Sequence, residues 1–246
     1  MRFADKTALV TGSTRGIGAA TARLLAEEGA HVIVHGRALA AAETVAQRIG
    51  EQGGKASACA FDLGSSDAVR TGLAAILERH PTLDIVVNNA AVVSDGALIM
   101  MSDRDWDEVI NINLSGCFRV CRAVSRAMLS RRSGTIINVG SIGGMRSSPG
   151  QSNYSASKAG LVGFSRTMAR ELAPRGVRVN CVIPGVIDSG MTLRTNRRRV
   201  DEVVAHVPCK RRGTAMEVAQ AVAFLASDAA SYIYGAELVV DGGLCL

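Results

Sequence analysis

The sequence predicts an α/β fold, a doubly wound parallel sheet of about seven strands with helices on both faces. Short runs rich in Val and Ile alternate with longer Ala-rich runs along the whole chain. Several of the short runs are almost continuously apolar, which is typical of strands buried on both faces. No repeat, low-complexity tract or linker interrupts the alternation, so we expect a single domain, residues 1–246.

The expected strands and helices follow one another in chain order. Strands are predicted at residues 7–10, 31–35, 55–61, 85–88, 135–139, 178–183 and 237–240. Helices are predicted at residues 17–28, 39–52, 66–79, 103–131 and 153–175. Gly29 is expected to end the first helix. Two pairs have the spacing of capping boxes, Ser102 with Asp105 and Thr214 with Glu217.

The most irregular segment covers residues 184–214, begins with Pro184-Gly185 and is rich in Arg. Loops of this length are often functional, so we expect a mobile loop or lid here, with an ordinary surface insertion as the alternative. Together with residues 93–100 and 142–151, this segment is expected to shape a substrate pocket.

Composition excludes several classes of protein. Hydrophobic residues make up 48% of the chain and charged residues 20%, which excludes wholesale disorder. No apolar run approaches the roughly 18 residues of a membrane span, and the N-terminus lacks an apolar signal core, so we expect a cytoplasmic location and no membrane partner. The six cysteines form no C-x-x-C pair and the four histidines are scattered, so we expect buried thiols and no metal site.

A glycine-rich turn follows the first predicted strand and precedes a helix. It reads TGSTRGIG at residues 11–18, with glycines at 12, 16 and 18. Such glycines allow a tight turn and a close approach of the backbone to a phosphate, which the N-terminus of the next helix attracts. The spacing differs from the common G-x-G-x-x-G, and a purely structural turn is the alternative.

The second predicted strand ends in His35-Gly36-Arg37, without a nearby acid. Folds that prefer NAD usually place a carboxylate here for the ribose 2′-hydroxyl. Arg37 and Arg15 instead suit the oxygens of a 2′-phosphate. The predicted cofactor is therefore NADPH/NADP+, while the alternative is that Arg37 is a solvated loop residue.

Tyr154 and Lys158 stand four residues apart at the start of a predicted helix, so both project from one face. An ammonium near a phenol favours the phenolate and lowers its pKa from about 10. Such a tyrosine can protonate a carbonyl oxygen near neutral pH. Ser141 ends the fifth predicted strand, where its hydroxyl could bond the same oxygen.

These motifs occur in one order on one alternating framework, together with Asp62-Leu63, NNAA at 88–91, Asn113, YSASK at 154–158 and PG at 184–185. In this combination the chain resembles the short-chain dehydrogenase/reductase family almost from end to end, and within it the 3-oxoacyl-[acyl-carrier-protein] reductases. The resemblance implies a Rossmann-type fold. It also implies a catalytic set in which Tyr154 is the general acid, Lys158 lowers its pKa and binds the nicotinamide ribose, Ser141 orients the carbonyl and Asn113 holds a water in a proton relay.

The resemblance also implies a binding set for the nucleotide. Around the phosphates it places Gly12, Ser13, Thr14, Arg15, Gly16, Ile17 and Gly18, with Arg37 at the 2′-phosphate. Around the adenosine it places Asp62, Leu63, Asn89, Ala90 and Ala91, and around the nicotinamide Pro184, Gly185, Ile187 and Ser189, beside Tyr154 and Lys158. Two residues depart from the family pattern: Ala91 stands where glycine is usual, and Ser189 where threonine is frequent.

The activity implied is reduction of a β-ketoacyl thioester on acyl carrier protein, by a homotetramer or homodimer. The excess of 28 basic over 22 acidic residues permits an anionic partner, and Arg131, Arg132 and Arg175, with Arg194 and Arg197–Arg199, could form a basic rim for such a carrier. Alternatives are a free ketone or alcohol, a sugar, a steroid or a polyketide as substrate, and an NADPH sensor without turnover. Nucleic-acid binding is not expected, because aromatics are 4% of the chain and form no stacking pattern.

Overall fold

A computed structural model describes residues 1–146, 148–189 and 197–246, and it confirms the predicted fold class. Seven parallel strands form one sheet in the order β3-β2-β1-β4-β5-β6-β9. Their bounds are Thr7–Val10 (β1), His31–Gly36 (β2), Lys55–Ala60 (β3), Leu83–Asn88 (β4), Gly134–Val139 (β5), Val177–Pro184 (β6) and Glu237–Val240 (β9). Each bound lies within two residues of the range expected from the sequence.

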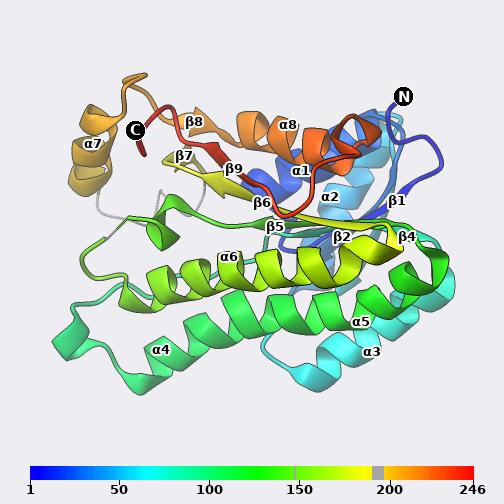
Figure 1. The fold of residues 1–246 in the computed structure, drawn as a ribbon, viewed down its shortest axis with the longest axis horizontal. Coiled ribbons are helices and arrows are strands. Elements are labelled where there is room, and N and C mark those ends of the chain that lie inside the picture. Colours follow the sequence, from blue (N-terminus) through cyan, green and yellow to red (C-terminus); the bar gives the residue numbers. More distant parts are fainter. Residues whose placement is uncertain (147, 190–196) are drawn as a thin grey trace.

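Helices cover both faces of this sheet (Figure 1). One face carries α1 (Gly16–Glu27), α2 (Leu39–Glu51) and α8 (Ala215–Ala226). The other carries α3 (Ser66–Arg79), α4 (Asp103–Ile110), α5 (Cys117–Arg131) and α6 (Ser152–Leu172). The strand β1 alternates between the two layers: Ala8 and Val10 belong to the first core and Leu9 to the second.

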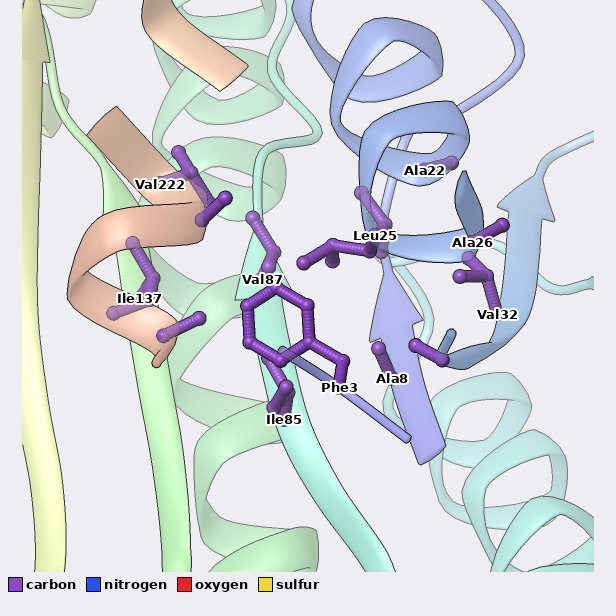
Figure 2. Packing of buried hydrophobic residues seen from close by; sticks show 14 of the residues in the cluster. Phe3, Ala8, Ala22, Leu25, Ala26, Val32, Ile85, Val87, Ile137 and Val222 are labelled. Carbon is purple, nitrogen blue, oxygen red and sulfur yellow. The ribbon is translucent and has the colours of Figure 1, made fainter. Parts of the chain in front are cut away.

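Figure 2 shows part of the first core. Leu25 of α1 and Val222 of α8 lie over Val87 and Ile137 of the sheet, and the ring of Phe3 from the N-terminal segment packs into the same layer. All five are at most 2% exposed. This packing holds the strands in place, so that their carboxyl ends form a rigid edge.

The predicted helix 103–131 is not a single α-helix. The chain turns as α4, then as a π-helical segment over Asn111–Gly116, and then as α5. A π segment accommodates an extra residue in a helix and is frequent at functional sites. Here it turns the buried Asn113 side chain toward the backbone of Val92, an interaction that periodicity alone does not reveal.

The helix predicted at 153–175 ends at Leu172 and continues as a 3₁₀ turn over Ala173–Arg175. Pro174 explains the change, because proline lacks the N–H that a continuing α-helix needs. Of the two predicted capping boxes, Thr214 and Glu217 form the full reciprocal box at α8. At α4, the Ser102 side chain accepts a bond from the Asp105 backbone N–H.

The irregular segment 184–214 contains more regular structure than expected. Its described parts include β7 (Ile187–Asp188), α7 (Arg197–His206) and β8 (Gly213–Thr214), with β7 and β8 paired in a small parallel sheet. Residues 190–196, which include Arg194, lie outside the described residues. The role of this segment as a lid stays a prediction.

None of the described helices is long and apolar enough to span a membrane. Among the described residues, no group of three or more His, Cys, Asp and Glu side chains could hold a metal ion. All six thiols are free; Cys117, Cys121 and Cys181 are buried, Cys59 is half-buried, and Cys209 and Cys245 are exposed.

Candidate active site

The strand order reverses direction between β1 and β4, which are neighbours in the sheet. In open parallel sheets, ligands bind at the carboxyl ends of the strands at such a reversal. The loops that follow the two strands meet there. A Cβ built on Gly12, after β1, would lie 2.7 Å from the Cα of Ala90, after β4. This reversal brings the glycine-rich turn and the NNAA segment together.

The glycine-rich turn needs glycine at the predicted positions. Gly12 and Gly16 have positive φ angles, 62° and 56°, which favour residues without a side chain. A Cβ on Gly18 would lie 2.4 Å from the Asn89 amide nitrogen. Helix α1 begins at Gly16 without a side-chain cap and without an acid in its first turn. Its first N–H groups therefore remain available for an anion, so this cradle fits a nucleotide phosphate.

Polar side chains hold the turn against the neighbouring strands. The Asn89 amide donates to the carbonyls of Thr11 and Gly12, at 2.9 and 3.0 Å. The buried Thr11 hydroxyl accepts from the backbone N–H groups of Asn89 and Ala90. Ser13 is also buried, and its hydroxyl donates to the Val10 carbonyl. Asn89 and Ser13 were expected around the nucleotide, and the contacts of their side chains are with the protein backbone.

Two residues of this region were not singled out from the sequence. The sequence indicates Thr11 only as the first residue of the glycine-rich motif, and His35 only as a residue near the end of the second strand. His35 is 2% exposed and accepts from the backbone N–H of Gly12 through Nδ1, at 3.2 Å. A polar residue in a buried strand, directly before a glycine, was the available signal.

Arg15 and Arg37 lie at the same edge of the sheet. A Cβ on Gly36 would lie 2.7 Å from the Thr14 methyl group, so the residues that follow Thr14 and Gly36 begin side by side. Both arginines are exposed, and within the described part of the chain neither guanidinium forms a hydrogen bond or an ion pair. Two uncommitted cations at one place suit a phosphate dianion.

The residues predicted at the adenine follow β3. Asp62 is exposed, and its Oδ1 accepts from the backbone N–H of Gly64 at 2.8 Å, which fixes the turn. Leu63 is buried in the second core. Asp62 thus offers an exposed hydrogen-bond acceptor next to the apolar Leu63, as expected for residues around an adenine.

The predicted catalytic side chains converge at the ends of β5 and α6. Ser141 follows β5 and caps the 3₁₀ turn Ile142–Gly144, accepting from the Gly143 backbone N–H at 3.0 Å. A Cβ on Gly143 would lie 3.3 Å from the Tyr154 ring and 3.4 Å from the Ser141 oxygen. The Ser141 hydroxyl and the Tyr154 ring thus lie on the same side of this short turn, next to the position where a Gly143 side chain would stand.

Lys158 lies one helical turn beyond Tyr154 and is 3% exposed. Its ammonium lies 5.7 Å from the centre of the Tyr154 ring and donates to the Val139 carbonyl at 2.8 Å. Burial lowers the pKa of Lys158 to about 8. The phenol and the amine thus point to the same region, as the spacing predicts.

Burial raises the pKa of Tyr154, while a hydrogen bond with Ser141 lowers it and the charge of Asp95 raises it. The net direction is upward, opposite to the lowering expected from Lys158. Desolvation is the largest cause, and the Lys158 ammonium is engaged by Val139. Ser141 is therefore the described group that favours the phenolate in this arrangement.

Asn113 connects the π segment to this site. Its amide donates to the Val92 carbonyl at 2.9 Å and accepts from the Val92 N–H at 2.8 Å. It also donates to the Ser157 hydroxyl, which in turn donates to the Tyr154 carbonyl. Asn113 therefore lies beside helix α6, which carries Tyr154 and Lys158, and its contacts are with the protein.

The predicted nicotinamide segment follows β6. The Gly185 N–H donates to the Val240 carbonyl, and a Cβ there would lie 2.7 Å from the Asp241 Cα. Ile187 is buried in β7. Half-buried Ser189 lies close to the phosphate turn, since a Cβ on Gly16 would be 3.5 Å from the Ser189 Cβ. The structure thus brings residues from six loops to one sheet edge.

Comparison with known proteins assigns this arrangement to a family. A family profile described as enoyl-(acyl carrier protein) reductase matches residues 12–245. The chain is 45% identical over 241 residues to the 3-oxoacyl-[acyl-carrier-protein] reductase FabG of Chlamydia trachomatis, covering 98% of this chain and 97% of that protein. The chain belongs to the short-chain dehydrogenase/reductase family.

Other members of the family are equally similar in length and identity. FabG of Escherichia coli is 44% identical over 244 residues, with 99% of both chains covered. Nodulation protein G of Rhizobium meliloti is 42% identical over 242 residues, covering 98% of this chain and 97% of that protein. As a member of the short-chain dehydrogenase/reductase family with FabG relatives, the protein is an oxidoreductase.

Proposed function

We propose that this oxidoreductase reduces the ketone of a β-ketoacyl thioester, carried by acyl carrier protein, to the β-hydroxyacyl thioester with NADPH. The observation that supports it most is the convergence of Ser141, Tyr154 and Lys158 beside the glycine-rich turn. The printed names of the FabG relatives support the choice of thioester. By the same reasoning we place the reaction in fatty acid or related acyl-chain biosynthesis.

The bound nicotinamide nucleotide supplies the hydride. Tyr154 holds the proton that the ketone oxygen receives, and Ser141 donates a hydrogen bond to the same oxygen. The raised pKa of Tyr154 keeps the phenol protonated before reduction. Lys158 then stabilises the phenolate as it forms, and Asn113 supports the relay that returns a proton through a water.

The preference for NADPH rests on Arg15 and Arg37. Both are exposed at the turn where the adenosine ribose is expected. The described residues at this edge include no carboxylate positioned after β2, where a diol-binding acid would stand. We propose that the whole set predicted from the sequence binds the nucleotide. These residues are Gly12, Ser13, Thr14, Arg15, Gly16, Ile17, Gly18, Arg37, Asp62, Leu63, Asn89, Ala90, Ala91, Tyr154, Lys158, Pro184, Gly185, Ile187 and Ser189.

Three arginines of the expected basic rim, Arg131, Arg132 and Arg175, do not border the site within one chain. Arg131 and Arg132 precede β5 and Arg175 precedes β6, whereas Ser141 follows β5. With six residues in β5, the two ends are about 20 Å apart. Arg131 also donates to the carbonyls of Pro81 and Leu83. Arg131 and Arg132 therefore bond to backbone carbonyls at the amino edge of the sheet, and none of the three arginines surrounds the proposed catalytic groups of its own chain.

We further propose that the protein is cytoplasmic and self-associates as a homotetramer or homodimer. The outer faces of α5 and α6 support the second proposal. Phe118 of α5 is 42% exposed and meets Phe164 of α6 edge to face, with ring centres 6.1 Å apart. A pair of aromatic rings at the surface of two long helices is a suitable contact between copies.

The decisive experiment compares wild-type protein with Tyr154→Phe. The substitution keeps the ring and removes only the hydroxyl, so NADPH binding should persist. Turnover of a β-ketoacyl-carrier thioester should fall by about 100-fold or more, the usual contribution of a general acid. Stopped-flow NADPH oxidation measures turnover, and fluorescence titration measures binding.

The substrate is identified in the same assay with a panel of carrier-bound thioesters, free thioesters and free ketones, each with NADPH and with NADH. The proposal expects the highest kcat/KM for a carrier-bound β-ketoacyl group and NADPH. Near-normal turnover by Tyr154→Phe would refute the acid assignment. Preference for a free ketone, sugar or steroid would refute the thioester, and binding without turnover of any substrate would indicate a sensor.

A further inference from the structure

His35 is a buried polar residue that the catalytic set does not use. It is the next-to-last residue of β2, and its ring packs against that of Phe61, a residue of the second core, at a centre distance of 4.2 Å. The imidazole lies between two backbone groups of different loops. Nδ1 faces the N–H of Gly12 at 3.2 Å, and Nε2 faces the carbonyl of Phe61 at 3.0 Å.

These two partners determine the protonation state of the ring. A backbone N–H can only donate and a carbonyl can only accept, so Nδ1 is the acceptor and Nε2 carries the proton. Only the neutral imidazole provides this combination. Burial is the largest effect on the pKa of His35 and lowers it to about 4, while the hydrogen bond with the Phe61 carbonyl acts in the opposite direction and raises it. Cys59 lies in register with His35 on the neighbouring strand β3, and Asp62 directly follows Phe61.

We propose that His35 is a positioning residue for the nucleotide, which acts by fixing the Gly12 amide and thereby the shape of the phosphate-binding turn. Gly12 is held from both sides: His35 accepts from its N–H, and Asn89 donates to its carbonyl. The same ring holds Phe61, directly before the predicted adenine contact Asp62. One side chain thus links the phosphate turn with the adenine end. This inference rests on the proposed nucleotide site.

Further bonds show that the end of β2 and the turn form one unit. The Ser13 N–H donates to the His35 carbonyl at 2.9 Å, and the His35 N–H donates to the Ser13 hydroxyl at 2.9 Å. Loss of the imidazole therefore leaves the strand attached to the turn. Its specific effect is on the peptide of Gly12, whose φ is positive and whose orientation decides where the turn's N–H groups point.

Two variants separate the two ring nitrogens. His35→Asn places an amide oxygen on Cγ, where Nδ1 lies, and can still accept from Gly12. His35→Gln places an amide nitrogen near the position of Nε2 and can still donate to Phe61, but leaves Gly12 without its acceptor. Each variant loses one hydrogen bond. The matched control is His31→Gln, at the other end of β2, where Nε2 meets the Ser57 hydroxyl far from the turn.

The expected result is asymmetric. In fluorescence titration, the Kd for NADPH should rise by about tenfold in His35→Gln and stay within about threefold of wild type in His35→Asn and His31→Gln. The kcat at saturating NADPH should be unchanged in all three. Without nucleotide, hydrogen exchange of the Gly12 amide should accelerate in His35→Gln and not in His35→Asn.

Two outcomes overturn the proposal. One is wild-type affinity and Gly12 exchange in His35→Gln. The other is equal weakening in His35→Asn and His35→Gln, in proportion to a shared loss of thermal stability, which would mark a merely structural residue. A wild-type protein that fails to bind NADPH would refute the proposed function instead, and Gly12 exchange in the free protein would still decide the role of His35.

Discussion

At Gly12, two independent physical constraints act on one residue. The φ angle of 62° is in the left-handed region, where a side chain is strained. The space is closed as well, because a Cβ would lie 2.7 Å from the Cα of Ala90. The contact atom belongs to the backbone of the neighbouring loop, which cannot rotate away as a flexible side chain could. Glycine is therefore required both for the turn and for the approach of β1 to β4.

Gly12→Ala should consequently lose stability and nucleotide binding together. Strain of this kind costs about 1–3 kcal/mol, and the displaced Ala90 loop should raise the Kd for NADPH more than tenfold. Thermal denaturation and fluorescence titration measure the two effects. Gly50→Ala is the matched control. Gly50 is exposed in α2 with nothing within 4 Å of a Cβ, so alanine should stabilise the protein by up to about 1 kcal/mol. Equal behaviour of the two variants would contradict this account.

At the scale of elements, the π-helical segment Asn111–Gly116 joins α4 to α5 and forms hydrogen bonds on two opposite sides. Asn113 points to Val92 and to Ser157 of α6. Asn111 points the other way: its amide donates to the Gly64 carbonyl and its Oδ1 accepts from Arg119. Residues two apart in a helix face nearly opposite sides, so Asn111 and Asn113 bond to opposite surroundings from one short segment.

Because Asn113 lies beside α6 and Asn111 does not, substitutions at the two positions should differ in their effect on kcat while costing similar unfolding free energy. Asn113→Ala leaves both polar groups of Val92 without their partner and frees α6 beside Tyr154. We expect a loss of about 1–3 kcal/mol in unfolding free energy and a lower kcat at saturating NADPH. Asn111→Ala should cost a similar free energy and leave kcat unchanged. Urea unfolding and steady-state kinetics test both variants, and a kcat loss of equal size in both would show that the segment acts only through stability.

At the scale of the whole molecule, two apolar layers fix a sheet whose carboxyl edge carries every proposed catalytic and nucleotide contact. The residues of the proposed catalytic and nucleotide sets come from the segments that follow β1, β2, β3, β4, β5 and β6, with Tyr154 and Lys158 at the start of α6. Binding to such a site should therefore couple to the stability of the entire fold, because the folded chain alone presents all six loops at once.

Ligand binding should raise the melting temperature in a nucleotide-specific way. NADPH at 100 times its Kd should add about 2.7 kcal/mol, which corresponds to roughly 5–10 °C for a chain of this size. NADH at the same concentration should add less, and Arg37→Ala should reduce the difference between the two nucleotides. Differential scanning fluorimetry measures each shift. A larger shift with NADH than with NADPH would contradict the assignment of Arg15 and Arg37 to a 2′-phosphate.

Much of the fold was predictable because its signals are local. Strand-length runs between helix-length Ala-rich stretches marked the seven strands, several of them through nearly continuous Val and Ile, and the glycines at 12, 16 and 18 marked the turn. The proximity of Tyr154 and Lys158 was predictable from a helical spacing of four residues. The π segment was not, since its buried Asn113 bonds to the backbone of Val92, 21 residues away in the sequence. Nor was the small β7–β8 sheet, which forms between segments that are remote in sequence.

The sequence by itself determined the fold class, the family, and which residue types stand at the phosphate turn and in the catalytic set, because these depend on spacing along one chain. Only the tertiary structure decided what each side chain does. In the structure the side chains of Asn89 and Ser13 bond to backbone carbonyls, and the Lys158 ammonium donates to the Val139 carbonyl. Arg131 and Arg132 lie at the edge of the sheet opposite Ser141. The structure also revealed His35 as the bridge between two loops. Hydrogen bonding and desolvation depend on neighbours brought together across the sheet, and sequence order does not record them.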